Sequence, residues 1–195
     1  MTTTDQRFEA AALDQYARQV TMGVALLGGV LLLPVLFLYL SGLLLRGVGT
    51  TGALLAAGIA LALLLWLLLS YAAAAQRYTI GADTLVIKRR WLRAIRVPLA
   101  SVVAVMPTTQ LAGDNVRALG VRRVLNFGVF GYAGRITLEP YGGAYFCATN
   151  RGRLVVVARV QQQALLLSPE RPQMFVEALR AALMQRGAQE RDSRA

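Results

Sequence analysis

Histidine is absent from this chain of 195 residues, and cysteine occurs once, at Cys147. Without histidine the chain cannot use imidazole for acid–base catalysis, for a Ser-His-Asp triad or for metal ligation. One thiolate cannot build a metal site, and no intramolecular disulfide can form. The single lysine, Lys88, does not lie in a glycine-rich phosphate-binding loop. We therefore expect a protein that is not an enzyme and that holds neither a cofactor nor a metal.

Charged residues are missing from two long stretches, residues 19–45 and residues 47–76. Crossing the hydrocarbon core of a bilayer takes about 20 mostly apolar residues in a helix, and each stretch is longer than that. A short glycine-rich turn separates them. We predict a transmembrane helical hairpin over residues 20–75, with spans at about 20–45 and 50–75.

The expected spans carry no ionisable side chain, whereas transport paths and proton relays place such groups inside the membrane. The hairpin is therefore typical of an anchor. Small residues recur at four-residue spacing in the second span, at Gly52, Ala56 and Ala60. Such a stripe favours close helix contact, either with the first span or with a second copy in a homo-oligomer.

The formal charge of +11 lies in the C-terminal part, because acids and bases balance before Gln76. Six cations follow the second stretch closely, whereas the turn offers only Arg46. This bias predicts a multi-pass protein of the plasma membrane with both termini in the cytoplasm. Residues 1–19 are then a cytoplasmic segment, and Phe8, Ala12 and Tyr16, four residues apart, predict a helix from Thr4 to Gln19.

After Arg77 the pattern changes to short runs rich in β-branched residues, separated by turns. Such spacing is typical of a small antiparallel barrel or sandwich. We predict an α+β domain over residues 76–187. Its expected strands are residues 78–80, 84–87, 94–99, 101–106, 135–139, 144–149, 154–159 and 163–167.

A helix is expected to follow these strands and to close one end of the domain. Ser168 is a suitable cap and Pro169 suits a first turn. Phe175, Leu179 and Leu183 form an apolar stripe at helical spacing. Gly187 is the expected end of this helix, and residues 188–195 are expected to be a flexible tail.

The stretch resembles bacterial pleckstrin-homology-like (PH-like) domains that follow short membrane anchors. The residues that carry the resemblance form five pieces in order. They are Tyr78, Ile80, Asp83, Leu85 and Ile87; Val97-Pro98-Leu99 with Val102 and Val103; the segment from Phe127 to Gly134; Tyr145 to Thr149; and Ser168-Pro169-Glu170-Arg171-Pro172 with Phe175 and Leu179.

The resemblance covers about residues 76 to 186, and Thr108 to Leu125 departs from the family pattern. It implies a PH-like fold behind a two-helix anchor and a location at the membrane, but neither a ligand nor catalytic residues. Three glycines, Gly128, Gly131 and Gly134, have the spacing of a nucleotide-binding loop. Because no helix follows them and aromatic residues interleave, we interpret them as a strand bend.

One candidate lipid site is a predicted hairpin tip. Its candidate residues are Lys88, Arg89, Arg90, Trp91, Arg93 and Arg96. Cations near an anionic membrane surface are attracted to it, and tryptophan favours the headgroup zone. The alternative is that these cations only set the membrane orientation.

A second hypothesis is a protein-interaction module whose partner is not identified by the sequence. Its candidate surface contains Phe127, Phe130 and Tyr132, which could equally belong to the core of a bent strand. Nucleic-acid binding would draw on the same arginines, but nothing else favours it. We therefore predict a non-catalytic binding or scaffold module at the membrane surface, contacting either anionic lipids or a protein.

Overall fold

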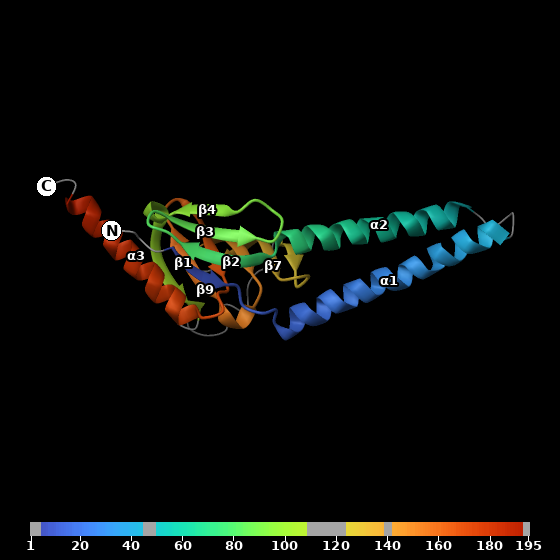
Figure 1. The fold of residues 1–195 in the computed structure, drawn as a ribbon, viewed down its shortest axis with the longest axis horizontal. Helices are drawn as coiled ribbons and strands as arrows, with labels where there is room; N and C mark the ends of the chain where they lie inside the picture. Colours follow the sequence, from blue (N-terminus) through green and yellow to red (C-terminus); the bar gives the residue numbers. More distant parts are fainter. Residues whose placement is uncertain (1–4, 45–49, 109–123, 139–141, 193–195) are drawn as a thin grey trace.

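The computed structural model describes residues 5–44, 50–108, 124–138 and 142–192. The molecule is elongated (Figure 1), with two long helices, α1 (Gln15–Leu44) and α2 (Thr50–Ala73), extending from one side of a two-sheet domain. A third helix, α3 (Pro172–Asp192), lies at the opposite side.

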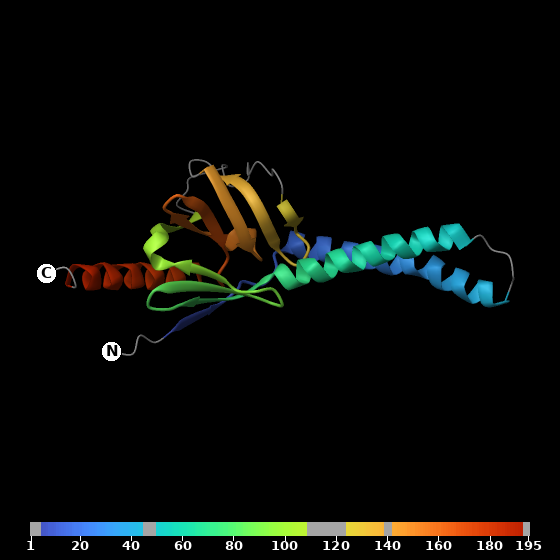
Figure 2. The same cartoon turned by 90° about the horizontal axis from the view of Figure 1, so that it is seen from above.

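The uncharged stretches of the sequence form α1 and α2, which lie side by side in both views (Figures 1 and 2) and contact each other. Many of their described large apolar side chains are exposed, whereas Ala60 is only 5% exposed. The side chains of Gly52 and Ala56 lie outside the described set. Over the described residues, no helix combines the length and the apolar character that a membrane crossing requires.

The first sheet has four antiparallel strands in the order β1-β2-β3-β4. The strands are β1 (Gln6–Glu9), β2 (Ala75–Ile80), β3 (Thr84–Arg89) and β4 (Ile95–Pro98).

The helix predicted from Thr4 to Gln19 is wrong before Gln15, where α1 begins. Residues 6–9 of this segment form β1 and pair with β2. The ring of Phe8 packs edge-on against Phe175 at 5.3 Å, and a salt bridge of 2.7 Å joins Glu9 to Arg77. These distant contacts outweigh a local periodicity that is too short to stabilise an isolated helix.

The second sheet has six strands in the order β5-β9-β10-β8-β7-β6. They are β5 (Val102–Pro107), β6 (Val124–Phe127), β7 (Tyr132–Leu138), β8 (Gly142–Ala148), β9 (Val155–Arg159) and β10 (Gln162–Leu167). The pairing of β8 with β10 is parallel, so the sheet is not purely antiparallel. Short 3₁₀ turns precede β5 (η1, Leu99–Ser101) and β9 (η4, Arg151–Arg153).

Neither sheet closes on itself among the described strands, so the barrel alternative is wrong and the domain has two separate sheets (Figure 2). The eight predicted strands all correspond to described strands, with ends shifted by a few residues. β6 was not predicted, and most of the segment without a family pattern, residues 109–123, lies outside the described residues.

The main hydrophobic core contains residues of both sheets together with one face of α3. Tyr78, Leu85, Val157 and Phe175 are fully buried within it. A second cluster contains Tyr132, Phe146 and Leu166 and reaches Ala17 of α1. The beginning of α1 is therefore part of the packed domain.

Buried hydroxyl groups join the N-terminal segment to this core. The Tyr78 hydroxyl donates to the carbonyl of Cys147 and accepts from the Ser168 N–H, each at 3.2 Å. The Ser168 hydroxyl accepts from the Thr149 N–H at 2.7 Å, and the Thr149 hydroxyl donates to the carbonyl of Ala11. Since an unpaired buried polar group is costly, this network holds residue 11 in place.

The C-terminal helix exists, but both of its predicted ends are wrong. Ser168 is buried, and its hydroxyl accepts from the Thr149 N–H just after β8, so it does not cap α3, which begins at Pro172. The helix passes through Gly187 and reaches Asp192, and a Cβ atom at Gly187 would meet nothing within 4 Å. The predicted apolar stripe is present, since Phe175 and Leu179 are fully buried.

The glycine-rich segment forms a bend between β6 and β7, as interpreted from the sequence. Positive φ angles occur at Gly128 (102°), Phe130 (55°) and Gly131 (124°). A Cβ atom at Gly131 would lie 2.8 Å from the carbonyl oxygen of Ala148. This position therefore requires glycine for both its backbone angle and its close approach to β8.

Replacing Gly131 by Ala should lower the free energy of unfolding by about 1–3 kcal/mol, because alanine is strained at this φ angle and clashes with Ala148. The matched control is Gly187→Ala in α3, where the helix should become about 1 kcal/mol more stable or stay unchanged. Chemical unfolding of the full chain, followed by circular dichroism, measures both. Equal stability of the two variants would contradict the assignment.

Candidate functional site: the joint between the helix pair and the domain

The tip of the β3–β4 hairpin, defined here as residues Arg90–Ala94, is held in shape by Arg89. Its guanidinium donates from Nε to the carbonyl of Arg93 at 2.9 Å, with a second bond from Nη2. Arg89 is half-buried, whereas Arg90 and Arg93 are exposed. Arg89 therefore has a bracing role: its guanidinium stabilises the conformation of the tip by bonding to the tip's own backbone.

The tip is hydrogen-bonded to the end of α2. The backbone N–H groups of Trp91 and Leu92 donate to the carbonyl of Ala72 at 3.3 and 3.2 Å. The backbone N–H of Arg90 donates to the carbonyl of Ala74 at 3.1 Å. The last carbonyls of a helix have no partner within the helix itself. The tip supplies such partners and fixes its own position relative to α2.

Side chains reinforce this contact around Tyr71, in the last turns of α2. The Arg90 guanidinium lies 4.4 Å from the centre of the Tyr71 ring. The rings of Trp91 and Phe130 meet Tyr71 edge-on at 5.2 and 5.1 Å. Even so, Trp91 remains 68% exposed. The tip is thus anchored through its backbone while the Trp91 indole stays accessible.

The strand register relates the remaining predicted cations to this tip. Arg96 pairs with Val86, and Ile95 with Ile87. Because alternate residues of a strand share a face, Lys88 and Arg96 lie on the outer face of the sheet, opposite the buried Ile87. Both are exposed. The structure therefore gathers the six predicted lipid-site residues on one hairpin, with Arg89 in a bracing position.

The predicted partner surface is placed differently. Tyr132 is only 2% exposed and belongs to the second core cluster. It is therefore a core residue, which was the alternative interpretation of this segment. Phe130 is half-buried against Tyr71. The side chain of Phe127 lies outside the described set. The described aromatics of this loop hold the helix pair and do not form an open patch.

Asp14 holds the beginning of α1 on the domain. Its carboxylate accepts from the Ala17 N–H at 2.7 Å, which caps the helix, and from the Tyr132 hydroxyl at 2.9 Å. The Arg151 N–H donates to the same carboxylate at 3.1 Å, and its guanidinium lies 4.6 Å from the centre of the Tyr16 ring. An acidic residue directly before a helix is a recognisable N-cap signal. The cap was not predicted because the helix was expected to begin at Thr4, which placed Asp14 in its interior.

Burial alone would raise the pKa of Asp14, but the bonds from Ala17, Arg151 and Tyr132 and the positive charge of Arg151 outweigh it. The pKa of Asp14 therefore lies below its ordinary value. Burial, and then the Asp14 carboxylate, raise the pKa of Tyr132, so its hydroxyl stays protonated and donates.

Thr21 and Gly128 also contribute to the contact between the beginning of α1 and the domain. The Thr21 hydroxyl accepts from the Phe130 N–H at 2.9 Å and donates to the Ala17 carbonyl at 2.6 Å. A Cβ atom at Gly128 would lie 3.0 Å from the Tyr16 ring. The β6–β7 bend thus allows α1 to pack closely against the domain.

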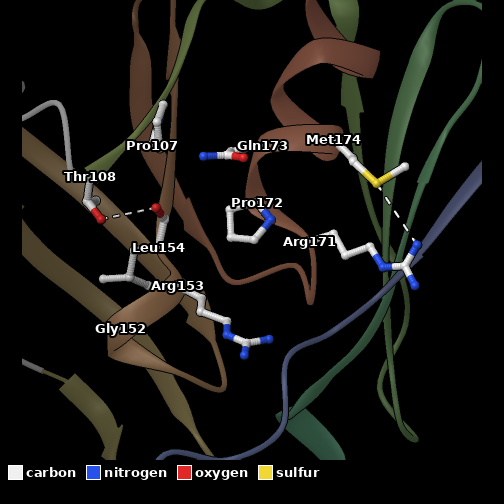
Figure 3. Close-up of a pocket in the computed structure, with 9 residues that line it drawn as sticks. All are labelled: Pro107, Thr108, Gly152, Arg153, Leu154, Arg171, Pro172, Gln173 and Met174. Atoms are coloured by element: carbon white, nitrogen blue, oxygen red, sulfur yellow. Dashed lines mark hydrogen bonds between the residues drawn. The ribbon is translucent and has the colours of Figure 1, made fainter.

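A separate pocket of about 520 Å³ lies beside the first turn of α3 (Figure 3). The Arg153 guanidinium donates to the carbonyl of Glu170 at 2.9 Å, and Thr108 to that of Leu154 at 3.0 Å. Among the described residues, the lining contains two arginines and no carboxylate side chain. No pattern in the sequence predicts this pocket, because its residues come from three separate segments. They are Pro107, Thr108, Gly152, Arg153, Leu154, Arg171, Pro172, Gln173 and Met174.

Within the described part of the chain, no cluster of acidic or cysteine side chains could hold a metal ion. Cys147 is buried, and burial raises the pKa of its thiol to about 11. The thiol is therefore protonated at neutral pH and a poor nucleophile.

Cys147 should react slowly with a maleimide in the folded protein at pH 7.5, and rapidly after unfolding in urea, because both burial and the raised pKa disfavour the thiolate. Thiol labelling followed by mass spectrometry measures this difference. The unfolded chain is the control. Rapid labelling of the folded chain would show that Cys147 is accessible.

Asp14→Ala should destabilise the protein by about 1 kcal/mol or more, since the cap of α1 and the partner of Tyr132 are lost. Asp14→Asn keeps an acceptor, so its loss should be smaller. Because the folded pKa is below the unfolded one, the carboxylate contributes fully above its ordinary pKa of 3.8. That contribution disappears as the pH falls through the folded value.

Urea unfolding of the full chain at neutral and acidic pH tests this prediction. The difference between wild type and Asp14→Asn should shrink on acidification. Glu177→Gln, on the exposed face of α3, is the control at neutral pH and should change stability by less than about 0.5 kcal/mol. A difference for Asp14→Asn that grows at acidic pH would contradict the assigned role.

Comparison with known proteins supports the domain part of this description. Residues 76–183 match the family described as Bacterial PH domain. No curated protein and no solved structure matches the chain. The match includes β2 to β10 and most of α3, but not β1, α1 or α2. Since it spans more than half of the 195 residues, the chain belongs to the bacterial PH domain family.

Proposed function

We propose that this chain is an integral membrane protein in which α1 and α2 anchor a PH-like binding module at the cytoplasmic surface of the plasma membrane. The observation that carries the proposal is the apolar surface of the helix pair. Leu26 and Phe37 of α1 are 71% and 70% exposed, and Leu54 of α2 is 73% exposed. Water disfavours so large an exposed apolar surface, whereas a bilayer would cover it.

The connectivity of the domain supports the same-side placement of both termini. β1 precedes α1 in the chain, yet it pairs with β2, which follows α2. A chain that crosses a membrane before α2 ends must therefore cross it an even number of times for these strands to meet. Two crossings, one by each helix, satisfy this requirement.

Charge placement gives the orientation. The described cations nearest the end of α2 are Arg77 and those of the β3–β4 hairpin, whereas the sequence between α1 and α2 contains a single cation, Arg46. Positive residues near the ends of spans favour the cytoplasmic side. The domain would then face the cytoplasm.

Members of the PH domain fold act in general as binding modules, and the described site supports binding more than chemistry. Anionic lipid headgroups are the partner that the exposed cations of the hairpin favour. A protein partner is the alternative, and the pocket beside α3 favours it because its two arginines could receive an acidic segment. Ala60 is buried in the helix pair, which supports packing of the small-residue stripe within one chain. A homo-oligomer predicted through Gly52, Ala56 and Ala60 would need further contact surface, because Ala60 is already covered.

The full chain should float with phospholipid vesicles and resist extraction by alkaline carbonate. Arginine at the centre of a span costs about 3 kcal/mol per residue, so Leu61→Arg combined with Leu65→Arg should reduce the membrane-integrated fraction. The matched control is Val103→Arg with Val160→Arg, at exposed apolar positions of the domain. A wild-type chain that remains in the supernatant as a soluble assembly would overturn the proposal.

A further inference from the structure

We propose that the β3–β4 hairpin is a contact site for anionic phospholipid headgroups, in which Trp91 and Leu92 enter the bilayer interface and Lys88, Arg93 and Arg96 lie against the phosphates. This inference rests on the proposed membrane anchoring and adds which residues meet the lipid and how they are held there.

The tip has a fixed height relative to the membrane anchor. Three backbone bonds join residues 90–92 to the carbonyls of Ala72 and Ala74, at and just beyond the last turn of α2. If α2 crosses the bilayer, its final turn lies at the headgroup level, and the tip must lie at that level as well. A loop that was merely basic and mobile would not be constrained in this way.

The exposed side chains of the tip have the composition that this level favours. Trp91 is held at one edge by Tyr71, at 5.2 Å, and Leu92 is exposed beside it. Tryptophan combines an apolar ring with a polar N–H and favours the interface between hydrocarbon and water. Two neighbouring exposed apolar residues at the end of a hairpin suit shallow insertion.

The charge of the hairpin is of one sign. No acidic residue occurs between Asp83 and Asp114, so β3, the tip and β4 contain none. Arg89 and Arg90 have described partners within the protein, the Arg93 carbonyl and the Tyr71 ring. Lys88, Arg93 and Arg96 are exposed on the same hairpin and are the cations assigned to the phosphates.

The experiment places the full chain in vesicles of phosphatidylcholine alone and of phosphatidylcholine with phosphatidylglycerol. The background variant is Trp66→Phe, which leaves Trp91 as the single tryptophan. Its fluorescence is then quenched from the water by acrylamide and from the bilayer by lipids brominated at shallow or deep acyl positions.

In anionic vesicles we expect acrylamide quenching of Trp91 to be several-fold weaker than in neutral vesicles, and shallow bromines to quench more than deep ones. Arg93→Gln with Arg96→Gln should remove most of this dependence on anionic lipid. The matched control is Arg153→Gln with Arg171→Gln, which removes the same charge beside the α3 pocket and should leave it unchanged. Slow labelling of Cys147 verifies that each variant is folded.

Three failures are distinguishable. A chain that resists carbonate extraction while Trp91 stays equally open to acrylamide in both vesicles overturns this inference and leaves the proposed anchoring intact. A chain that does not integrate at all overturns both. Equal protection of Trp91 in neutral and anionic vesicles would overturn the recognition of anionic headgroups.

Discussion

The two long helices depend on the domain for the hydrogen bonds at their near ends. At the start of α1 the Asp14 carboxylate accepts a hydrogen bond from a backbone N–H of the helix. At the end of α2 the backbone N–H groups of the β3–β4 tip donate to the carbonyl of Ala72. Helix ends always leave such groups without partners. Because both ends are satisfied by the same domain, the helix pair and the sheets are joined at two points and act as one structure.

This double attachment explains features of the β6–β7 bend that packing within the sheets alone does not require. Gly128 leaves room for the Tyr16 ring, Phe130 meets Tyr71, and the Tyr132 hydroxyl bonds to Asp14. The helices thus account for Gly128 and Phe130 of this bend, whereas Gly131 is required by its close approach to Ala148. The double attachment also makes the N-terminal segment a part of the domain, although that segment lies outside the residues that match the family.

The sequence predicted the α+β class, the order of most strands and the apolar stripe of α3, because these follow from local periodicity and turn residues. It did not predict β1, since the pairing partner of Phe8 is about 70 residues away. Nor could it separate a barrel from two open sheets, because closure depends on the register between distant strands. The candidate cations all lie on the β3–β4 hairpin, and their role as a lipid site stays a prediction. The bracing role of Arg89 could not be predicted, because it depends on the position of the Arg93 carbonyl.

The position of β1 has a consequence for the order of folding. β1 pairs with β2, but Phe8 also packs against Phe175, and Ala11 just after β1 bonds to Ser168. During synthesis this segment must therefore remain without its contacts to Ser168 and α3 until those later residues have been made. Contacts so far apart in sequence slow folding, and the complete packing of β1 requires residues on both sides of the helix pair in sequence.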